Sequence, residues 1–152
     1  MGNRRTRGRG AVEESGLSVT ALVLVAIWVI ADLLLGVGTM VDGVDGNAGL
    51  ETIAIVAFMV WGLTTVVLIA ALVVGSVALL WRPHRGVAHV VLYAAALIGG
   101  VVLSFALTSW GFGSDSVTTS TSLQVTSGAA ICVIAGLVMY ASVRLLGAGS
   151  SV

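Results

Sequence analysis

The residue best suited to chemistry is Asp32, an acid within the apolar run VIADLLLG at positions 29 to 36. An acid inside a membrane-length apolar segment is a default candidate for ion binding or proton relay. The alternative is a structural clasp, in which the carboxyl joins neighbouring helices through hydrogen bonds. We favour the clasp, because a relay needs polar groups at successive depths. Such groups are sparse and scattered: Ser76, Ser104, Thr108 and Gln124.

The other reactive residue types do not form a recognisable site. His84 and His89 stand five positions apart, whereas two ligands on one helical face are three or four apart. Cys132 is the single cysteine, so an intrachain disulfide is excluded. The sequence has no nucleophile–base pair, phosphate-binding loop or CxxC motif. We therefore expect no catalytic residue, metal site or cofactor, and hence no enzyme.

The composition is that of a membrane protein. Hydrophobic residues make up 58% of the 152 residues and charged residues 9%, and the mean hydropathy is +1.11. These values lie far outside those of soluble globular domains. All seven basic residues are arginine, and Ala, Val and Gly are abundant. This bias is typical of a high-GC prokaryotic or viral genome.

Four apolar segments are long enough to cross a bilayer core as helices, which takes about 20 residues. They are 17–41, 52–81, 87–110 and 123–146. The short polar breaks between them predict antiparallel neighbours, and so an all-α, up-down bundle of four transmembrane helices. The predicted organisation is a basic, flexible N-terminal arm at 1–16, a single membrane bundle at 17–146 and a short tail at 147–152.

The arginines predict which way the bundle faces. With four crossings, every arginine falls on one side of the membrane, which is the cytoplasmic side by the positive-inside rule. These residues are also our candidates for contact with anionic lipid or another polyanion: Arg4, Arg5, Arg7, Arg9, Arg82, Arg85 and Arg144. Both termini are therefore expected inside. The charged residues on the opposite side are all acids: Asp42, Asp45, Glu51 and Asp115.

The helical rise predicts which residues share the depth of Asp32. Asp32 lies nine residues, or about 13 Å, from the outer end of its span at Val41. The same count in the other spans reaches Trp61, Val101 and Cys132, with Gly62, Thr64, Thr65, Ser104 and Gly128 within a turn. No cation lies at this level, so we expect Asp32 to be mostly neutral at pH 7. We expect it to donate its acid proton to a nearby hydroxyl or carbonyl. The predicted clasp, or ion site, comprises Asp32, Trp28, Thr65 and Ser104.

Small residues recur at fourfold spacing in the third and fourth spans and predict helix-packing faces, because membrane helices associate through close backbone approach. One face has Ala96, Gly100 and Ser104, and the other has Gly128, Cys132 and Gly136. In the first span, Gly36 lies one turn beyond Asp32 on the same side. The sequence leaves open which face meets a neighbouring span and which meets a second subunit.

The N-terminal segment RRTRGRG at 4 to 10 is the clearest interaction feature. The interpretation that we favour is that this segment fixes the orientation of the chain in the membrane and contacts anionic lipid. The contact with lipid is worth about 1 kcal/mol per arginine near the surface. The alternative is non-specific contact with nucleic acid through phosphate neutralisation.

Together these features predict a non-enzymatic, multi-pass structural or accessory membrane protein of a prokaryotic cell membrane or viral envelope. Its partners are the lipid bilayer and either further copies of itself or a larger membrane protein. In organisation and composition the chain resembles small four-span proteins of lipid-enveloped archaeal viruses, which implies a structural protein of the envelope with its basic terminus toward the genome. A second alternative is a small oligomeric channel or transporter that places Asp32 on a water-filled path.

Overall fold

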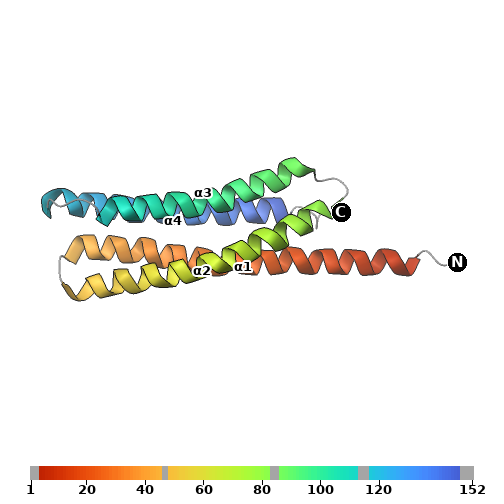
Figure 1. The fold of residues 1–152 in the computed structure, drawn as a ribbon, viewed down its shortest axis with the longest axis horizontal. Helices are drawn as coiled ribbons and strands as arrows, with labels where there is room; N and C mark the ends of the chain where they lie inside the picture. Colours follow the sequence, from red (N-terminus) through yellow and green to blue (C-terminus); the bar gives the residue numbers. More distant parts are fainter. Residues whose placement is uncertain (1–3, 46–47, 83–85, 113–116, 148–152) are drawn as a thin grey trace.

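The computed structural model describes residues 4–45, 48–82, 86–112 and 117–147, and the side chains of 16–41, 55–82, 86–110 and 121–147. Within these ranges the chain is all-helical: α1 spans Arg4–Asp45, α2 Ala48–Leu80, α3 Val87–Phe112 and α4 Val117–Gly147 (Figure 1). The prediction of an all-α protein with four long helices is confirmed. The helix α2 ends at Leu80, three residues before Pro83, the one proline of the sequence. Proline disfavours helix at the residue before it, which is consistent with a break between α2 and α3.

Each helix contains a stretch that is long and apolar enough to cross a membrane. These stretches are Gly16–Val41, Ile55–Leu80, Val87–Trp110 and Thr121–Gly147. They agree with the predicted spans to within three residues; in α2 the side chains are described only from Ile55 onward, so the predicted start at 52 lies outside them. The chain thus has the form of a multi-pass integral membrane protein.

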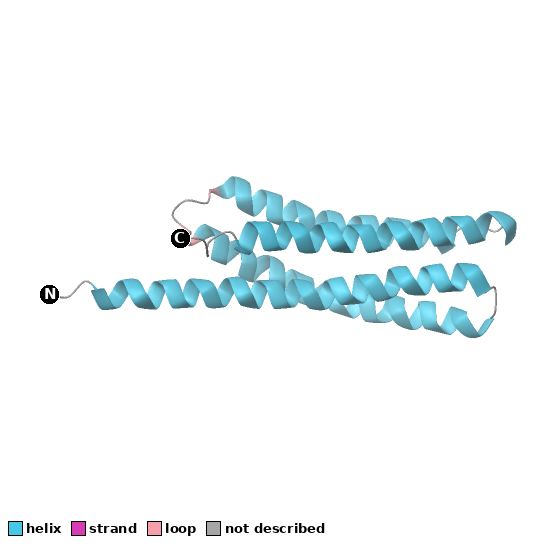
Figure 2. Ribbon diagram, turned by 180° about the vertical axis from the view of Figure 1, so that it is seen from behind, coloured by secondary structure: helices cyan, strands magenta, loops and turns pink. Residues whose placement is uncertain are grey.

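The N-terminal segment is not separated from the first span. The sequence predicted a flexible arm over 1–16, whereas α1 begins at Arg4 and runs without a break into the span. Extending an existing helix adds one hydrogen bond per residue and needs no new nucleus. The N-terminal part of α1 extends past the ends of the other three helices (Figure 2).

The four helices lie side by side along one long axis (Figure 1). We call the end of the bundle formed by Val41, Ile55, Trp110 and Thr121 the distal end. The end formed by Gly16, Leu80, Val87 and Gly147 is the proximal end. The helices α1 and α2 contact each other in opposite sequence order, because Ser18 meets Arg82 and Asp32 meets Trp61.

The first helix contributes more buried residues to the core than any other helix. Half of its apolar stretch is buried, against 28%, 22% and 28% for those of α2, α3 and α4. Its most extensive contacts are with α4 and α2, and α3 packs mainly on α4. The fully buried side chains of α1 include Val25, Trp28, Asp32 and Leu35. The remaining helices therefore turn most of their surface toward lipid.

A buried tyrosine fixes α3 against α2. Tyr93 is fully buried, and its hydroxyl donates to the Ala71 carbonyl at 2.9 Å. Its side chain packs against Gly75, where an added Cβ would come within 2.5 to 2.6 Å of two ring carbons and the hydroxyl oxygen. Glycine at position 75 therefore makes room for the ring.

We expect Gly75→Ala to lower the free energy of unfolding by about 1–3 kcal/mol, the usual cost of overpacking a filled core. The free energy is measured by titration with a denaturing detergent. Gly62→Ala on the same helix is the control, because a Cβ there meets nothing within 4 Å. If the Tyr93 ring is the cause, the cost of Gly75→Ala largely disappears in a Tyr93→Leu background. An equal cost in both backgrounds would show that the ring is not responsible.

Candidate functional site

Asp32 lies at the point where α1, α2 and α3 meet. The Trp61 indole N–H on α2 donates to Asp32 Oδ1 at 2.8 Å, and the Ser104 hydroxyl on α3 donates to Oδ2 at 3.0 Å. Asp32 and Ser104 are fully buried, and Trp61 is 4% exposed. A single carboxyl side chain therefore links three helices, with both of its oxygens bonded.

The fourth helix contributes Cys132, which is close enough to Asp32 for an electrostatic interaction between the two groups. Its sulfur packs beside Gly36, one turn from Asp32, where an added Cβ would lie 2.7 Å from Cys132 Sγ. All four helices thus supply a residue at one level. We call Asp32, Trp61, Ser104 and Cys132 the polar centre.

The indole of Trp61 is held in place by its own surroundings. Its ring stacks on that of Phe58, with ring centroids 5.8 Å apart and planes 25° apart. The hydroxyls of Thr64 and Thr65 donate to the Trp61 carbonyl at 2.9 and 3.0 Å. The stacking restrains the indole that donates to Asp32, whereas the two threonine hydroxyls bond only the main chain of Trp61.

The structure brings together only part of the predicted clasp. Ser104 bonds Asp32 as expected, but Thr65 bonds the Trp61 carbonyl instead. Trp28 is fully buried, and its indole N–H has no hydrogen-bond partner among the described residues. Its ring packs over Gly100, 3.4 Å from the position of an added Cβ. The missing member is Trp61, which the depth count had placed at the correct level.

The donor set determines where a proton on Asp32 would reside. An indole N–H can only donate, so Oδ1 must act as an acceptor. A hydroxyl can donate or accept, so the contact between Ser104 and Oδ2 is compatible with both states of the carboxyl. In the neutral state the proton therefore lies on Oδ2, facing Ser104. The described residues place no arginine or histidine at this level to balance a negative charge.

The predicted packing residues divide between two interfaces and the outer surface. Gly36 and Gly128 bring the backbones of α1 and α4 together: an added Cβ on Gly128 would lie 2.5 Å from the Gly36 carbonyl oxygen. Gly100 of α3 packs against Val138 of α4. Ala96, which is also on α3, is half-buried. Gly136 is exposed, and a Cβ there meets nothing within 4 Å. The fourth-span face thus meets mainly α1 and ends at the outer surface.

The described arginines lie at the proximal end. Arg82 Nη2 donates to Ser18 Oγ at 3.0 Å, which ties the end of α2 to the first turn of the α1 span. Arg144 Nε donates to the Tyr140 hydroxyl at 3.0 Å, and the guanidinium lies 5.5 Å from that ring's centroid. Arg4, Arg5, Arg7 and Arg9 belong to α1, but their side chains lie outside the described set, as does Arg85 entirely.

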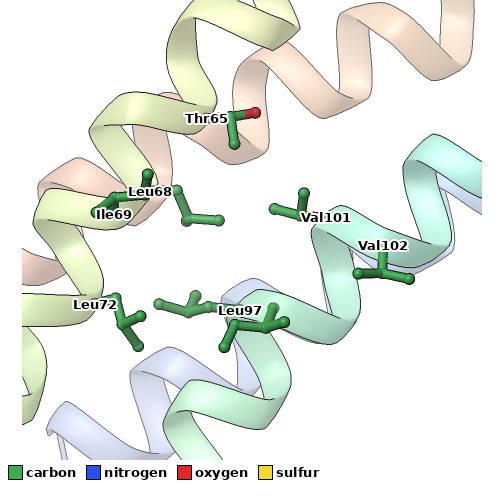
Figure 3. Close-up of a pocket in the computed structure, with 8 residues that line it drawn as sticks. Thr65, Leu68, Ile69, Leu72, Leu97, Val101 and Val102 are labelled. Atoms are coloured by element: carbon green, nitrogen blue, oxygen red, sulfur yellow. The ribbon is translucent and has the colours of Figure 1, made fainter.

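A cavity of about 150 Å³ separates α2 from α3 (Figure 3). Its lining is apolar except for Thr65, whose hydroxyl already donates to the Trp61 carbonyl. The lining residues are Thr65, Leu68, Ile69, Leu72, Leu97, Ile98, Val101 and Val102. The cavity is partly open to the outside of the bundle, and its lining offers no ionisable side chain.

Among the described residues there is no group of three His, Cys, Asp or Glu side chains that could hold a metal ion. His84 lies outside those residues. His89 is half-buried in the first turn of α3, within the predicted third span. Comparisons of the chain with protein-family models, with curated proteins and with solved structures found no match.

Proposed function

We propose that the protein is a non-enzymatic, structural or accessory component of a membrane, in which Asp32 fastens the helices of an up-down bundle. Both termini lie on the cytoplasmic side in this proposal. The opposite sequence order of contacts between α1 and α2 supports the up-down arrangement. The positions of Arg82 and Arg144 at the proximal end, where α1 also begins, support an inward-facing proximal end.

The burial of Asp32 carries this proposal. A transport site must meet water at some stage of its cycle, whereas a clasp must be enclosed and bonded. Asp32 is fully buried, and both of its oxygens are hydrogen-bonded to side chains of α2 and α3. Each of these observations favours the clasp over the channel or transporter.

Assembly with a partner would use the lipid-facing surface of α4. Most of the small residues predicted to form helix-packing faces pack inside the bundle, but Gly136 does not. Val133, Leu137 and Tyr140 beside it are 62%, 61% and 59% exposed. A glycine between exposed larger residues lets another helix approach closely. We propose that this face of α4 meets a second copy or a larger membrane protein.

The experiment that tests this function has two measurements on the purified full chain. Light scattering in mild detergent gives the mass of the particle, and proteoliposomes report flux of protons and monovalent cations. We expect a defined oligomer or a co-purified membrane protein, loss of that association in Gly136→Ile, and no flux above that of empty vesicles. Flux that disappears in Asp32→Asn would contradict the proposal and establish the transport function. A monomer with no partner would contradict the assembly role.

A further inference from the structure

Arg144 places a cation on the outer surface of α4, within the stretch that is long and apolar enough to cross a membrane. That stretch ends at Gly147, so Arg144 lies three residues, or about 4.5 Å, from its proximal end. Its Nε donates to the Tyr140 hydroxyl at 3.0 Å, and the guanidinium lies 5.5 Å from the centroid of the Tyr140 ring. Both side chains are exposed. The pair therefore presents a positive charge at the proximal edge of the lipid-facing surface.

The guanidinium is held by a neutral group one turn deeper in the span. A basic side chain in the last turn of a helix can instead bond the last carbonyls, where the helix dipole favours a cation. Among the described residues, Tyr140 is the one polar partner of the Arg144 side chain. The hydrogen bond and the ring contact fix the position of the guanidinium, but a phenol hydroxyl leaves its charge without a counter-ion.

The donors needed to bind an anion remain on the guanidinium. Of its five N–H groups, the bond to Tyr140 uses only the one on Nε, which leaves the four on Nη1 and Nη2. An arginine can donate two such bonds in parallel to the oxygens of one phosphate or carboxylate. The one acid among the described side chains is Asp32, which is buried in the distal half of the bundle. The described part of the chain therefore supplies no anion for Arg144.

The depth of the pair favours a lipid phosphate as that anion. The apolar stretch of α4 has 27 residues, or about 40 Å, whereas the hydrocarbon core of a bilayer is about 30 Å thick. A helix centred on the core therefore extends about 5 Å into the headgroup layer at each end, which is the level of Arg144. The phosphodiesters of the lipids lie in this layer. Tyrosine is also enriched at this interface.

We propose that Arg144 and Tyr140 form a binding site for the headgroup of an anionic phospholipid, whose phosphodiester oxygens accept hydrogen bonds from Nη1 and Nη2. Arg82 lies at the same end of the bundle but is tied to Ser18 of α1 instead. The inference goes beyond the proposed function and does not depend on it. Gly136, where a partner helix is proposed to approach, lies eight residues, or about 12 Å, deeper along α4.

The test counts bound lipids by native mass spectrometry of the purified full chain, titrated in mild detergent with phosphatidylglycerol or phosphatidylcholine. We expect the first phosphatidylglycerol to bind more tightly than phosphatidylcholine. Arg144→Gln should weaken this binding about tenfold, the effect of losing hydrogen bonds to a charged group. Tyr140→Phe keeps the ring but removes the hydroxyl that fixes Nε, so we expect a smaller loss of about threefold. Circular dichroism shows that each variant is folded.

A charge-matched control separates a defined site from general attraction between charges. Arg144→Gln is combined with Val87→Arg, which restores the net charge at a 68% exposed position at the proximal end of α3. We expect this double variant to bind phosphatidylglycerol as weakly as Arg144→Gln alone. Inorganic phosphate in excess is expected to leave the lipid bound, which distinguishes a lipid headgroup from free phosphate as the ligand.

Four results would overturn the proposal. They are equal affinity for the two lipids, unchanged affinity in Arg144→Gln, full recovery in the double variant, and displacement of the lipid by inorganic phosphate. Loss of an oligomer in Arg144→Gln with an unchanged lipid count would assign the arginine to a protein contact, and so overturn this proposal while the assembly role stands. A monomer that still binds phosphatidylglycerol through Arg144 would contradict the assembly role alone.

Discussion

Gly128→Ala is expected to lower the free energy of unfolding by about 2–3 kcal/mol, at the upper end of the range for overpacked cores. An added Cβ would lie 2.5 Å from the Gly36 carbonyl oxygen and 3.0 Å from the Met40 nitrogen. Both are backbone atoms of α1, so no side-chain rotation relieves the contact. The helices α1 and α4 would have to separate, and the packing of Cys132 beside Gly36 would be lost with them.

The matched control is Gly136→Ala, two turns along the same helix. A Cβ at this position meets nothing within 4 Å, so we expect no loss of stability in detergent with one protein per micelle. Both variants are unfolded by a denaturing detergent and followed by circular dichroism. Equal effects of the two substitutions would mean that α1 and α4 do not approach closely at Gly128.

The second large effect is expected at the polar centre. Asp32→Ala should cost about 2 kcal/mol, because it leaves the Trp61 indole N–H and the Ser104 hydroxyl buried without the partner that each has in the structure. Asp32→Asn should cost much less, because the amide still offers an oxygen to Trp61 and can still bond Ser104. The same detergent titration measures both, and a larger loss in Asp32→Asn than in Asp32→Ala would contradict the account.

The depth of each residue along the bundle could be predicted from the sequence, but the neighbour toward which its side chain points could not. A count of nine residues from the span ends placed Trp61 and Cys132 beside Asp32, because every helix rises by the same 1.5 Å per residue. Trp28 was predicted as a clasp residue because it lies one turn from Asp32 on the same side of the first span, whereas Trp61 was only placed at the same depth. Helix rotation decides between them. A membrane helix shows little apolar periodicity from which to predict rotation, because lipid and protein interior are both apolar.

The packing faces show the same limit. The fourfold spacing correctly marked Gly100, Gly128 and Cys132 as residues in close helix contacts, since small residues permit backbone approach. It did not reveal that Gly128 and Cys132 pack on α1, or that Gly136 remains at the surface. The answer depends on how far α4 turns between α1 and α3, which is set by the buried side chains of all three helices. At the N-terminus, where the sequence predicted a flexible arm, the helix of the first span continues back to Arg4.

The central claim is that Asp32 fastens α1 to α2 and α3 through hydrogen bonds, and a double-mutant cycle tests it most directly. The free energies of unfolding of wild type, Asp32→Ala, Trp61→Phe and the double variant give the coupling between the two side chains. Side-chain hydrogen bonds in membrane proteins show couplings of about 0.6 kcal/mol on average and about 1.7 at most. We predict a stabilising coupling near the upper value, because both groups are buried and the bond is 2.8 Å long. A coupling of zero, with the two single effects simply adding, would contradict the account.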